Sequence, residues 1–182
     1  KDYDVLDFGA KPDGVTLNTV AIQSAIDSAS ENGGGRVVLH PGRYLCGSVY
    51  LKNNVDLHLE KGAVLLGSLN PWDYIRDPYI GWTAFVLAVK QDNISISGEG
   101  TIDGRGFLVA TKMVEYVRRG LCNIPLRFDR PPEGWRPQNI HFRECNHIVI
   151  RDVTLKDPAC WTQQYELCTD LLLDGVKVDA KC

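Results

Sequence analysis

The glycine-rich stretch GEGTIDGRG, residues 98–106, has the composition of a phosphate-binding loop and follows the strand-like NISIS. A dinucleotide-binding loop needs the spacing G-x-G-x-x-G and a helix directly after it, so that backbone N–H groups face a pyrophosphate. Here Gly98, Gly100 and Gly104 give G-x-G-x-x-x-G, and the intervening TID is strand-like. We therefore interpret these glycines as tight bends between strands, and nucleotide binding is disfavoured.

The cysteines and histidines do not have the spacing of a metal site. The six cysteines form no C-x-x-C pair, and the four histidines form no H-E-x-x-H motif. Zinc sites commonly use such close pairs, so the sequence predicts neither a metal ion nor a cofactor. The cysteines are expected to be small buried residues, with one or two disulfides if the protein is exported.

Bulk composition restricts the function classes. The 182 residues suit one domain, and 44% hydrophobic and 24% charged residues are ordinary for a globular protein. The net charge of −3 argues against a nucleic-acid partner, which usually requires a basic surface. No apolar run reaches the roughly 18 residues that span a membrane. The chain begins at Lys1 and not at a methionine, so we expect that it was processed or cut from a longer protein.

A repeat of 23 residues indicates how the chain folds. When residues 142–155 are aligned with residues 165–178, every apolar position keeps its apolar character. The aligned pairs include Phe142 with Tyr165, Cys145 with Cys168, Ile150 with Leu173 and Leu155 with Val178. Each copy has two or three alternating apolar residues, a two-residue break and two more, which predicts short strands separated by bends.

Earlier copies are spaced more widely because they contain insertions. Ile96 lies 39 residues after Leu57 and 54 residues before Ile150. Removing one 23-residue unit leaves 16 and 31 extra residues, which we place in loops at about 68–83 and 106–136.

Short strands at this spacing predict an all-β fold, a parallel β-helix. A strand–helix–strand unit needs about 30 residues, so a 23-residue unit has no room for a crossover helix. In a β-helix each coil pairs its strands with the neighbouring coils, and apolar side chains form stacked columns inside. A β-sandwich is the alternative all-β fold, but it would not show an in-register 23-residue copy.

One helix is expected to cap the N-terminal end of the solenoid. The stretch NTVAIQSAIDSASENGGG can begin with Asn18 as N-cap and end at Gly33. Its apolar stripe consists of Ala21, Ile22, Ala25, Ile26 and Ala29. Laid over the first coil, the helix would shield the open core and the sheet edges. The single domain thus comprises an N-terminal strand and capping helix at residues 1–35, and coils over residues 36–182.

No comparable cap is predicted at the C-terminal end. The last repeat runs to VKVDAKC and stops within a coil. Because an uncovered solenoid end exposes strands to aggregation, we expect that Cys182 is not the natural terminus and that the parent chain continues.

Three segments resemble one known family. The opening DVLDFGAKPDGVTLNTVAIQSAID is similar to the N-terminal part of pectin-active, pectate-lyase-like right-handed β-helix proteins. ISGEGTIDGRG is more specific, and RPQNIHFRECNHIVIRDVTLKDPACW is the strongest match. Together they resemble the polygalacturonase family, glycoside hydrolase family 28. The resemblance covers nearly the whole chain outside the 107–135 insertion, and it implies a right-handed β-helix.

The resemblance implies hydrolysis of α-glycosidic bonds between galacturonic acid units, with inversion. Such hydrolysis needs carboxyl groups about 6.5–9.5 Å apart. The family carries its acids in the series N-x-D, D-D, G-H-G and R-x-K, and this series is not present. Asp103 and Asp170 are interpreted as turn residues, so we assign no catalytic residue. We expect an N-x-D within about ten residues beyond Cys182, and we expect this chain alone to be inactive.

Three residues are candidates for contact with a polysaccharide. Gln163 and Gln164 occupy the positions that Ile140 and His141 occupy one coil earlier, on the strand leading into the expected cleft. They can hydrogen-bond sugar hydroxyls, or else they form a solvated strand face. Trp161 can stack on a sugar ring, or else it packs in the core at a bend.

The second insertion is partly helical in pattern, in FLVATKMVEYVRR. From Gly106 to Pro137 it carries six basic and three acidic residues. It either forms a basic wall that suits a polyuronate chain or is an ordinary solvated loop with local ion pairs.

Two classes of function follow. The first is a secreted or periplasmic glycosidase that acts as a monomer on pectin or polygalacturonate, an acidic polysaccharide. The second is a pectate-lyase-like enzyme or a non-catalytic, carbohydrate-binding or tail-spike-like β-helix. A lyase would normally need a calcium-binding acidic cluster, and no such cluster is evident in the sequence.

Overall fold

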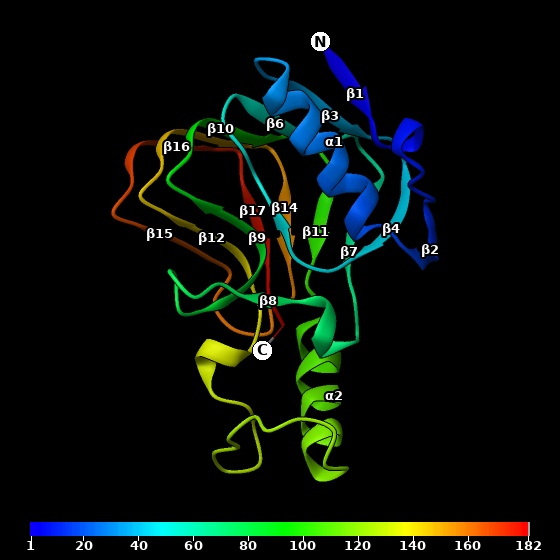
Figure 1. The fold of residues 1–182 in the computed structure, drawn as a ribbon, viewed down its shortest axis with the longest axis vertical. Helices are drawn as coiled ribbons and strands as arrows, with labels where there is room; N and C mark the ends of the chain where they lie inside the picture. The colour runs from blue at the N-terminus through cyan, green and yellow to red at the C-terminus, as the bar shows by residue number, and fades with distance from the viewer. Residues whose placement is uncertain (182) are drawn as a thin grey trace.

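The computed structural model describes residues 1–181 and shows a right-handed parallel β-helix with three sheets (Figure 1). Successive coils place one strand in each sheet, and each strand pairs in parallel with strands of neighbouring coils. The predicted fold class is therefore confirmed. The expectation about Cys182 concerns a residue outside those that the structure describes.

The three sheets are named A, B and C. Sheet A contains, in spatial order, β1 (Asp2–Asp4), β3 (Gly35–Leu39), β6 (Val55–Leu59), β10 (Asp92–Ser97), β13 (Asn146–Arg151) and β16 (Thr169–Asp174). Sheet B contains β17 (Lys177–Asp179), β14 (Thr154–Lys156), β11 (Thr101–Asp103), β7 (Ala63–Gly67), β4 (Gly42–Cys46) and β2 (Asp13–Leu17). Sheet C contains β15 (Gln163–Glu166), β12 (Gln138–Arg143), β9 (Thr83–Val89) and β5 (Val49–Tyr50). A short strand, β8 (Ile75–Arg76), pairs antiparallel with β9.

Strand register confirms the repeat. Ile150 lies opposite Leu173, and the backbone N–H of Thr169 donates to the carbonyl of Cys145 at 3.1 Å, so Cys168 follows Cys145 in the next coil. The other predicted pairs, at shifts of 23, 39 and 54 residues, also align: Phe142 with Tyr165, Leu155 with Val178, Leu57 with Ile96, and Ile94 with Ile148. The five cysteines that the structure describes are free thiols.

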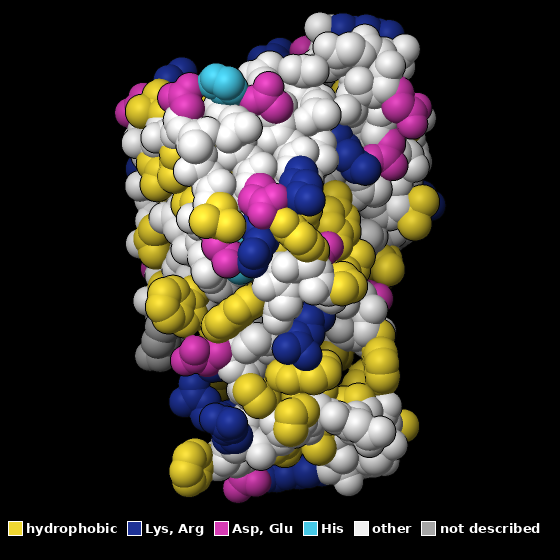
Figure 2. All heavy atoms as spheres, turned by 60° about the vertical axis from the view of Figure 1, so that its left-hand side comes forward, with side chains coloured by type: hydrophobic (Ala, Val, Ile, Leu, Met, Phe, Trp, Pro, Cys, Tyr) yellow, Lys and Arg dark blue, Asp and Glu magenta, His cyan; other side chains and the backbone are white. Residues whose placement is uncertain are grey.

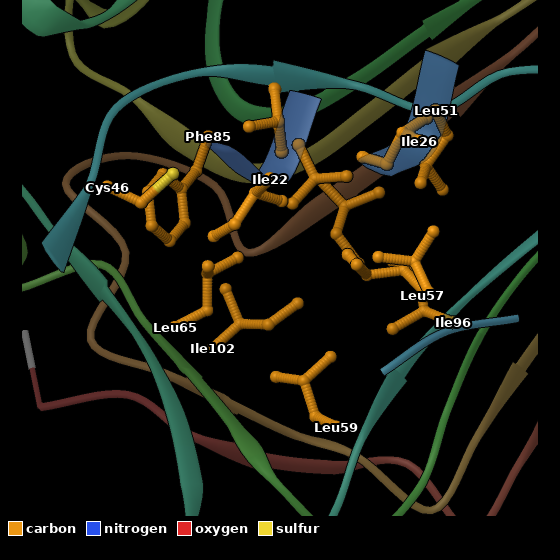
Figure 3. Close-up of a cluster of buried hydrophobic side chains, with 14 of the residues drawn as sticks. Ile22, Ile26, Cys46, Leu51, Leu57, Leu59, Leu65, Phe85, Ile96 and Ile102 are labelled. Atoms are coloured by element: carbon orange, nitrogen blue, oxygen red, sulfur yellow. The ribbon is translucent and has the colours of Figure 1, made fainter. Parts of the chain in front are cut away.

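Apolar side chains from all three sheets converge inside the coil (Figure 3). Alternation explains this, because every second residue of a strand points to the same face. In β6, for example, Val55, Leu57 and Leu59 are buried, whereas Asp56 and His58 between them are partly exposed. One resulting column runs through sheet A from Val37 over Leu57 and Ile96 to Ile150.

The capping helix forms as α1 (Thr19–Glu31) and buries its predicted stripe against the core (Figures 1 and 3). Asn18 stands at the N-cap position, but its side chain does not cap the helix. It accepts from the backbone N–H of Lys11 at 2.7 Å and donates to the carbonyl of Thr16 at 2.9 Å. The expected capping role of Asn18 is thus wrong, because these loop groups bind the amide instead.

Strand pairing begins earlier than expected. The short helix η1 (Val5–Phe8) separates β1 from β2, and these two strands pair with β3 and β4. Residues 1–35 therefore contain part of a first coil as well as the capping helix.

The two insertions lie where chain segments pass from sheet B to sheet C. The first contains η2 (Pro71–Asp73) and β8, and the second contains α2 (Gly106–Arg118) and η3 (Glu133–Trp135). Helix α2 and the loop after it project away from the coils (Figure 1). Over residues 1–181, neither helix has the length and apolar character to cross a bilayer.

Candidate functional site

Polar side chains gather on the outer face of sheet C. Phe142 points into the core and is fully buried, so its neighbours on β12, His141 and Arg143, point outward. The register places Gln164 of β15 beside His141 and Glu166 beside Arg143. Two consecutive coils thus place the imidazole of His141 beside the amide of Gln164, and the guanidinium of Arg143 beside the carboxylate of Glu166.

A chain of hydrogen bonds connects these side chains. Nδ1 of His141 lies 2.6 Å from Oε1 of Gln138, and Nε2 lies 3.3 Å from Oε2 of Glu166. Nε2 of Gln138 donates to Oε1 of Gln164 at 2.9 Å. The His141 side chain is 0% exposed, so it forms the buried centre of this polar chain. The contact with Gln138 holds the Gln164 side chain in place.

Burial controls the charge of His141. Removal from water lowers the pKa of the imidazole below its ordinary 6.5, and the hydrogen bond to Glu166 partly opposes that shift. The ring is therefore neutral at pH 7 and donates through only one nitrogen. If that donor is Nε2–H toward Glu166, Nδ1 must accept, which requires the amides of Gln138 and Gln164 to be turned over.

Arg143 supplies the cationic group of this face. Its Nη1 donates to Oε1 of Glu166 at 2.8 Å, and its guanidinium lies 4.9 Å from the centre of the Tyr79 ring. Glu166 thus contacts both His141 and Arg143, yet its side chain remains partly exposed. The ion pair is positioned to meet either hydroxyl or carboxylate groups of a ligand.

The first insertion covers the adjoining part of the face. Ile80 packs on Ala84 and Leu87, and Asp77 accepts from the Tyr50 hydroxyl at 2.7 Å. The outer surface of β9 is therefore closed, and the polar groups reach solvent chiefly at β15.

The structure separates the three residues proposed to contact sugar. Gln164 lies on the outer face, as the polar chain requires. Gln163 lies on the core side, because the hydroxyl of Tyr165 donates to its Oε1 at 2.8 Å and Tyr165 itself packs on the core. The two glutamines therefore do not act as one pair. Trp161 precedes β15 and is 58% exposed, which excludes core packing; its contact with a sugar stays a prediction.

Four residues of the polar face were not predicted from the sequence: Gln138, His141, Arg143 and Glu166. The 23-residue shift could have found the last two, since Arg143 aligns with Glu166 and the two carry opposite charges. No comparable signal identifies Gln138, because its contact with Gln164 spans 26 residues and departs from the repeat.

Asp103 and Asp170, both interpreted from the sequence as turn residues, differ in their positions. Asp103 ends β11 and accepts from the backbone N–H of Arg105 at 3.0 Å, as a turn residue would. Asp170 lies within β16 at φ 54°, not in a turn between strands. Over the described chain, no three His, Cys, Asp or Glu side chains are grouped to hold a metal ion.

Similarity to known proteins agrees with this geometry. A family model described as rhamnogalacturonase A/epimerase, pectate lyase-like, matches residues 3–168. The chain belongs to this family. Within it, the chain is a polygalacturonase-type parallel β-helix, as the resemblance implied.

Two relatives of this member of the rhamnogalacturonase A/epimerase family are named for activity on galacturonate polymers. A probable polygalacturonase of Vitis vinifera is 35% identical in an alignment 194 positions long, gaps included, that covers 96% of this chain and 36% of that protein. An exo-poly-α-D-galacturonosidase of Dickeya chrysanthemi is 37% identical in a 123-position alignment that covers 59% of this chain and 20% of that protein. The chain thus spans about a third or less of the length of these two relatives.

A solved structure covers the whole chain. It comes from Parabacteroides merdae, is described provisionally as a glycosyl hydrolase, and matches with a TM-score of 0.90 and 39% identity over 100% of this chain and 76% of its own. An epimerase matches as well. Mannuronan C5-epimerase AlgE1 of Azotobacter vinelandii is 32% identical in a 123-position alignment that covers 57% of this chain and 9% of that protein.

Proposed function

We propose that this chain is part of an inverting glycosidase of family 28 that hydrolyses α-linked, galacturonate-containing pectic polysaccharide. The observation that carries the proposal is the likeness to a polygalacturonase along nearly the whole chain. The polar outer face of sheet C agrees with it, since a sugar chain needs ordered hydrogen-bonding groups and an acidic one needs a cation.

We propose roles for three residues of this part of the molecule. The Gln164 amide, held by Gln138, is suited to bind sugar hydroxyls. The Arg143 guanidinium, already paired with Glu166, supplies the positive charge that a uronate carboxylate would meet. We propose that Trp161, which precedes β15 and is exposed, stacks on a sugar ring.

The chain alone is proposed to be inactive. Inverting hydrolysis uses two carboxyl groups about 6.5–9.5 Å apart. Glu166 is the one carboxylate within the described strands of sheet C, and it is paired with Arg143 and His141. No residue from 1 to 181 is therefore assigned as catalytic acid or base, and the N-x-D expected beyond Cys182 stays a prediction.

The test is an assay on polygalacturonate with the natural protein in which this sequence occurs, run with and without a chelator. Hydrolysis predicts new reducing ends, no dependence on the chelator and an inverted anomeric configuration by proton NMR. The 182-residue chain assayed in parallel should release none. Turnover by the short chain, or no reducing ends from the natural protein, would contradict the proposal.

The epimerase match supports a second candidate, an enzyme that acts at C5 of a uronate. A lyase would give an unsaturated product that absorbs in the near ultraviolet. An epimerase would change the sugar configuration without creating reducing ends. A non-catalytic carbohydrate-binding β-helix would bind polygalacturonate and leave it unchanged. Reducing ends, near-ultraviolet absorbance and the sugar configuration by proton NMR, measured on the same digest, therefore distinguish all of these activities from hydrolysis.

We further propose that the protein acts outside the cytoplasm, secreted or periplasmic, and as a monomer. A polysaccharide of the plant cell wall is too large to enter a cell intact, which supports the location. Fractionation of the producing cells and sedimentation of the purified protein test the two statements.

A further inference from the structure

A cavity lies between the two insertions, and its lining includes neither the His141–Gln164 polar chain nor the Arg143–Glu166 pair of the outer face. Its volume is about 300 Å³, at the lower end of the range for ligand pockets, about 300–1,000 Å³. The lining residues used below are Trp72, Arg76, Met113, Asn123, Ile124 and Trp135. The first two come from the first insertion, and the other four come from the second.

The walls of this cavity are fixed to each other. The Arg76 guanidinium lies 4.4 Å from the centre of the Trp135 ring, a distance typical of a cation–π contact. Thr83 Oγ1 donates to the carbonyl of Gly134 at 3.1 Å. Both contacts join one insertion to the other, so the cavity is built before any ligand arrives, which lowers the entropic cost of binding.

The floor and rim are apolar and aromatic. Met113 of α2 and Ile124 are buried beneath the cavity. Trp72 stands at the rim with 64% of its surface exposed, an unusual position for so large an apolar ring. Hydrophobic side chains gather over the projecting lower part of this molecular face, with Lys and Arg side chains among them (Figure 2). Exposed indole rings suit the C–H face of a sugar.

Arg76 gives the cavity its charge preference. Its Nε donates to the carbonyl of Gly81 at 3.1 Å, which orients the guanidinium against Trp135. No acidic side chain within residues 1–181 forms a salt bridge with it. The outer N–H groups can therefore form charge-assisted bonds with an incoming carboxylate.

We propose that this cavity binds one hexuronate residue of an acidic polysaccharide. The sugar ring stacks on Trp72, its carboxylate pairs with Arg76, and the Asn123 amide meets a hydroxyl. The inference rests on the proposed function for the class of ligand, but it adds a binding site that is separate from the outer face of sheet C. A polysaccharide held there as well would be anchored at a second point beside the strands.

The test compares two arginine variants by calorimetric titration with D-galacturonate. Arg76→Gln removes the charge from the cavity, and we expect the affinity to fall about tenfold or more. Arg127→Gln is the matched control, because Arg127 is an exposed residue of the same projecting region that lines no part of the cavity. It removes the same charge and should leave affinity within about twofold. Equal losses in both variants would overturn the proposal.

Two further probes separate the carboxylate from the ring. D-galactose, the neutral counterpart, should bind at least tenfold more weakly than D-galacturonate to the unaltered protein and equally weakly to Arg76→Gln. Trp72→Ala should weaken both sugars about equally, since it removes the stacking surface only. Equal affinity of the unaltered protein for the two sugars would exclude a uronate-selective cavity.

The indole N–H resonances locate the binding site without any mutation. Trp72 and Trp135 line the cavity, Trp82 packs over sheet C in the cluster with Leu87, and Trp161 precedes β15. D-galacturonate should shift the resonances of Trp72 and Trp135 and leave that of Trp82 in place. Shifts of Trp161 alone would overturn the cavity but retain the outer face of sheet C. Shifts of Trp72 and Trp135 in a protein that fails the hydrolysis assay would support the uronate-binding cavity and contradict the proposed glycosidase activity.

Discussion

At the scale of single residues, the outer face of sheet C depends on a histidine that is kept neutral. His141 is fully buried between Gln138 and Glu166, and burial lowers its pKa below 6.5. The folded protein therefore binds fewer protons at this site than the unfolded chain does. Stability from the neutral ring is present above about pH 6.5 and is lost as the pH falls through the lowered folded pKa.

Replacing this histidine should expose the dependence on pH. At pH 7.5 we expect the free energy of unfolding of His141→Gln to be about 1–3 kcal/mol lower than that of the unaltered protein. The reason is that partners of buried hydrogen bonds are left unsatisfied. The difference should narrow as the pH falls from 7 to 5. Urea denaturation at several pH values measures it. A difference that stays constant over this range would show that protonation of His141 is not linked to folding.

His40 provides a control of opposite sign. Its hydrogen bond to Glu60, and a second to Asp4, raise the pKa of the ring above 6.5. The stability from this contact is complete below about pH 6.5 and is lost as the pH rises through the folded pKa. In the same denaturation series, the difference between His40→Asn and the unaltered protein should widen toward low pH.

At the scale of elements, helix α2 is held against the coils by a close backbone approach at Gly106. A Cβ atom at this position would meet the backbone of Pro158 and Ala159. Alanine usually favours a helix over glycine by about 1 kcal/mol. Here we expect Gly106→Ala to destabilise by about 1–3 kcal/mol instead, since the added atom overpacks the junction.

Gly134 is the matched control for that junction. A Cβ there would stand 3.6 Å from the carbonyl of Gly81, an ordinary contact. Thermal unfolding of both variants measures the contrast. If Gly106→Ala is as stable as Gly134→Ala, then α2 does not pack on the 157–159 turn as described.

Helix α1 should contribute its apolar stripe to stability. Ile22 is fully buried in the core, whereas Val20 on the same helix is 79% exposed. Ile22→Ala should cost about 2–5 kcal/mol through lost burial and a cavity. Val20→Ala should change the free energy of unfolding by less than about 0.5 kcal/mol. Similar values for the two variants, measured by denaturant titration, would contradict the capping role.

The register of the coils could be predicted from the sequence because apolar columns impose it. Ile150 and Leu173 must stack if the core is to be continuous, so their 23-residue spacing carries structural information. Some polar contacts follow the same period, as Arg143 with Glu166 does, but others depart from it, as Gln138 with Gln164 does. The side chain of Asn18 binds Lys11 and Thr16 and leaves the helix uncapped. The core-side position of Gln163 could have been predicted from the alternation of side chains along a strand. The sequence interpretation instead treated the adjacent Gln163 and Gln164 as one pair on the same face.

At the scale of the whole molecule, the solenoid is a linear stack whose two ends differ. Helix α1 covers the end that carries β1, while β16 and β17 at the other described end have exposed side chains. Because each coil is stabilised mainly by its neighbours, hydrogen exchange in the 182-residue chain should be fastest at β16 and β17. We expect their amide protection to be at least about tenfold lower than that of β10 and β13.

Mass spectrometry of exchanged peptides measures this gradient. The strand β3, which pairs on both sides beneath α1, is the internal comparison and should stay as protected as β10. Uniform protection from β3 to β16 would indicate one all-or-none unit in place of a stack of coils.

The central claim is that the open outer face of sheet C is where this chain meets an acidic polysaccharide. The most direct measurement titrates trigalacturonate into the ¹⁵N-labelled protein and follows backbone amide resonances. We predict shifts at His141, Gln164 and Glu166, with the amides of Val149 and Leu172 on sheet A unchanged. Shifts confined to sheets A and B, or no saturable shift in sheet C, would contradict the account.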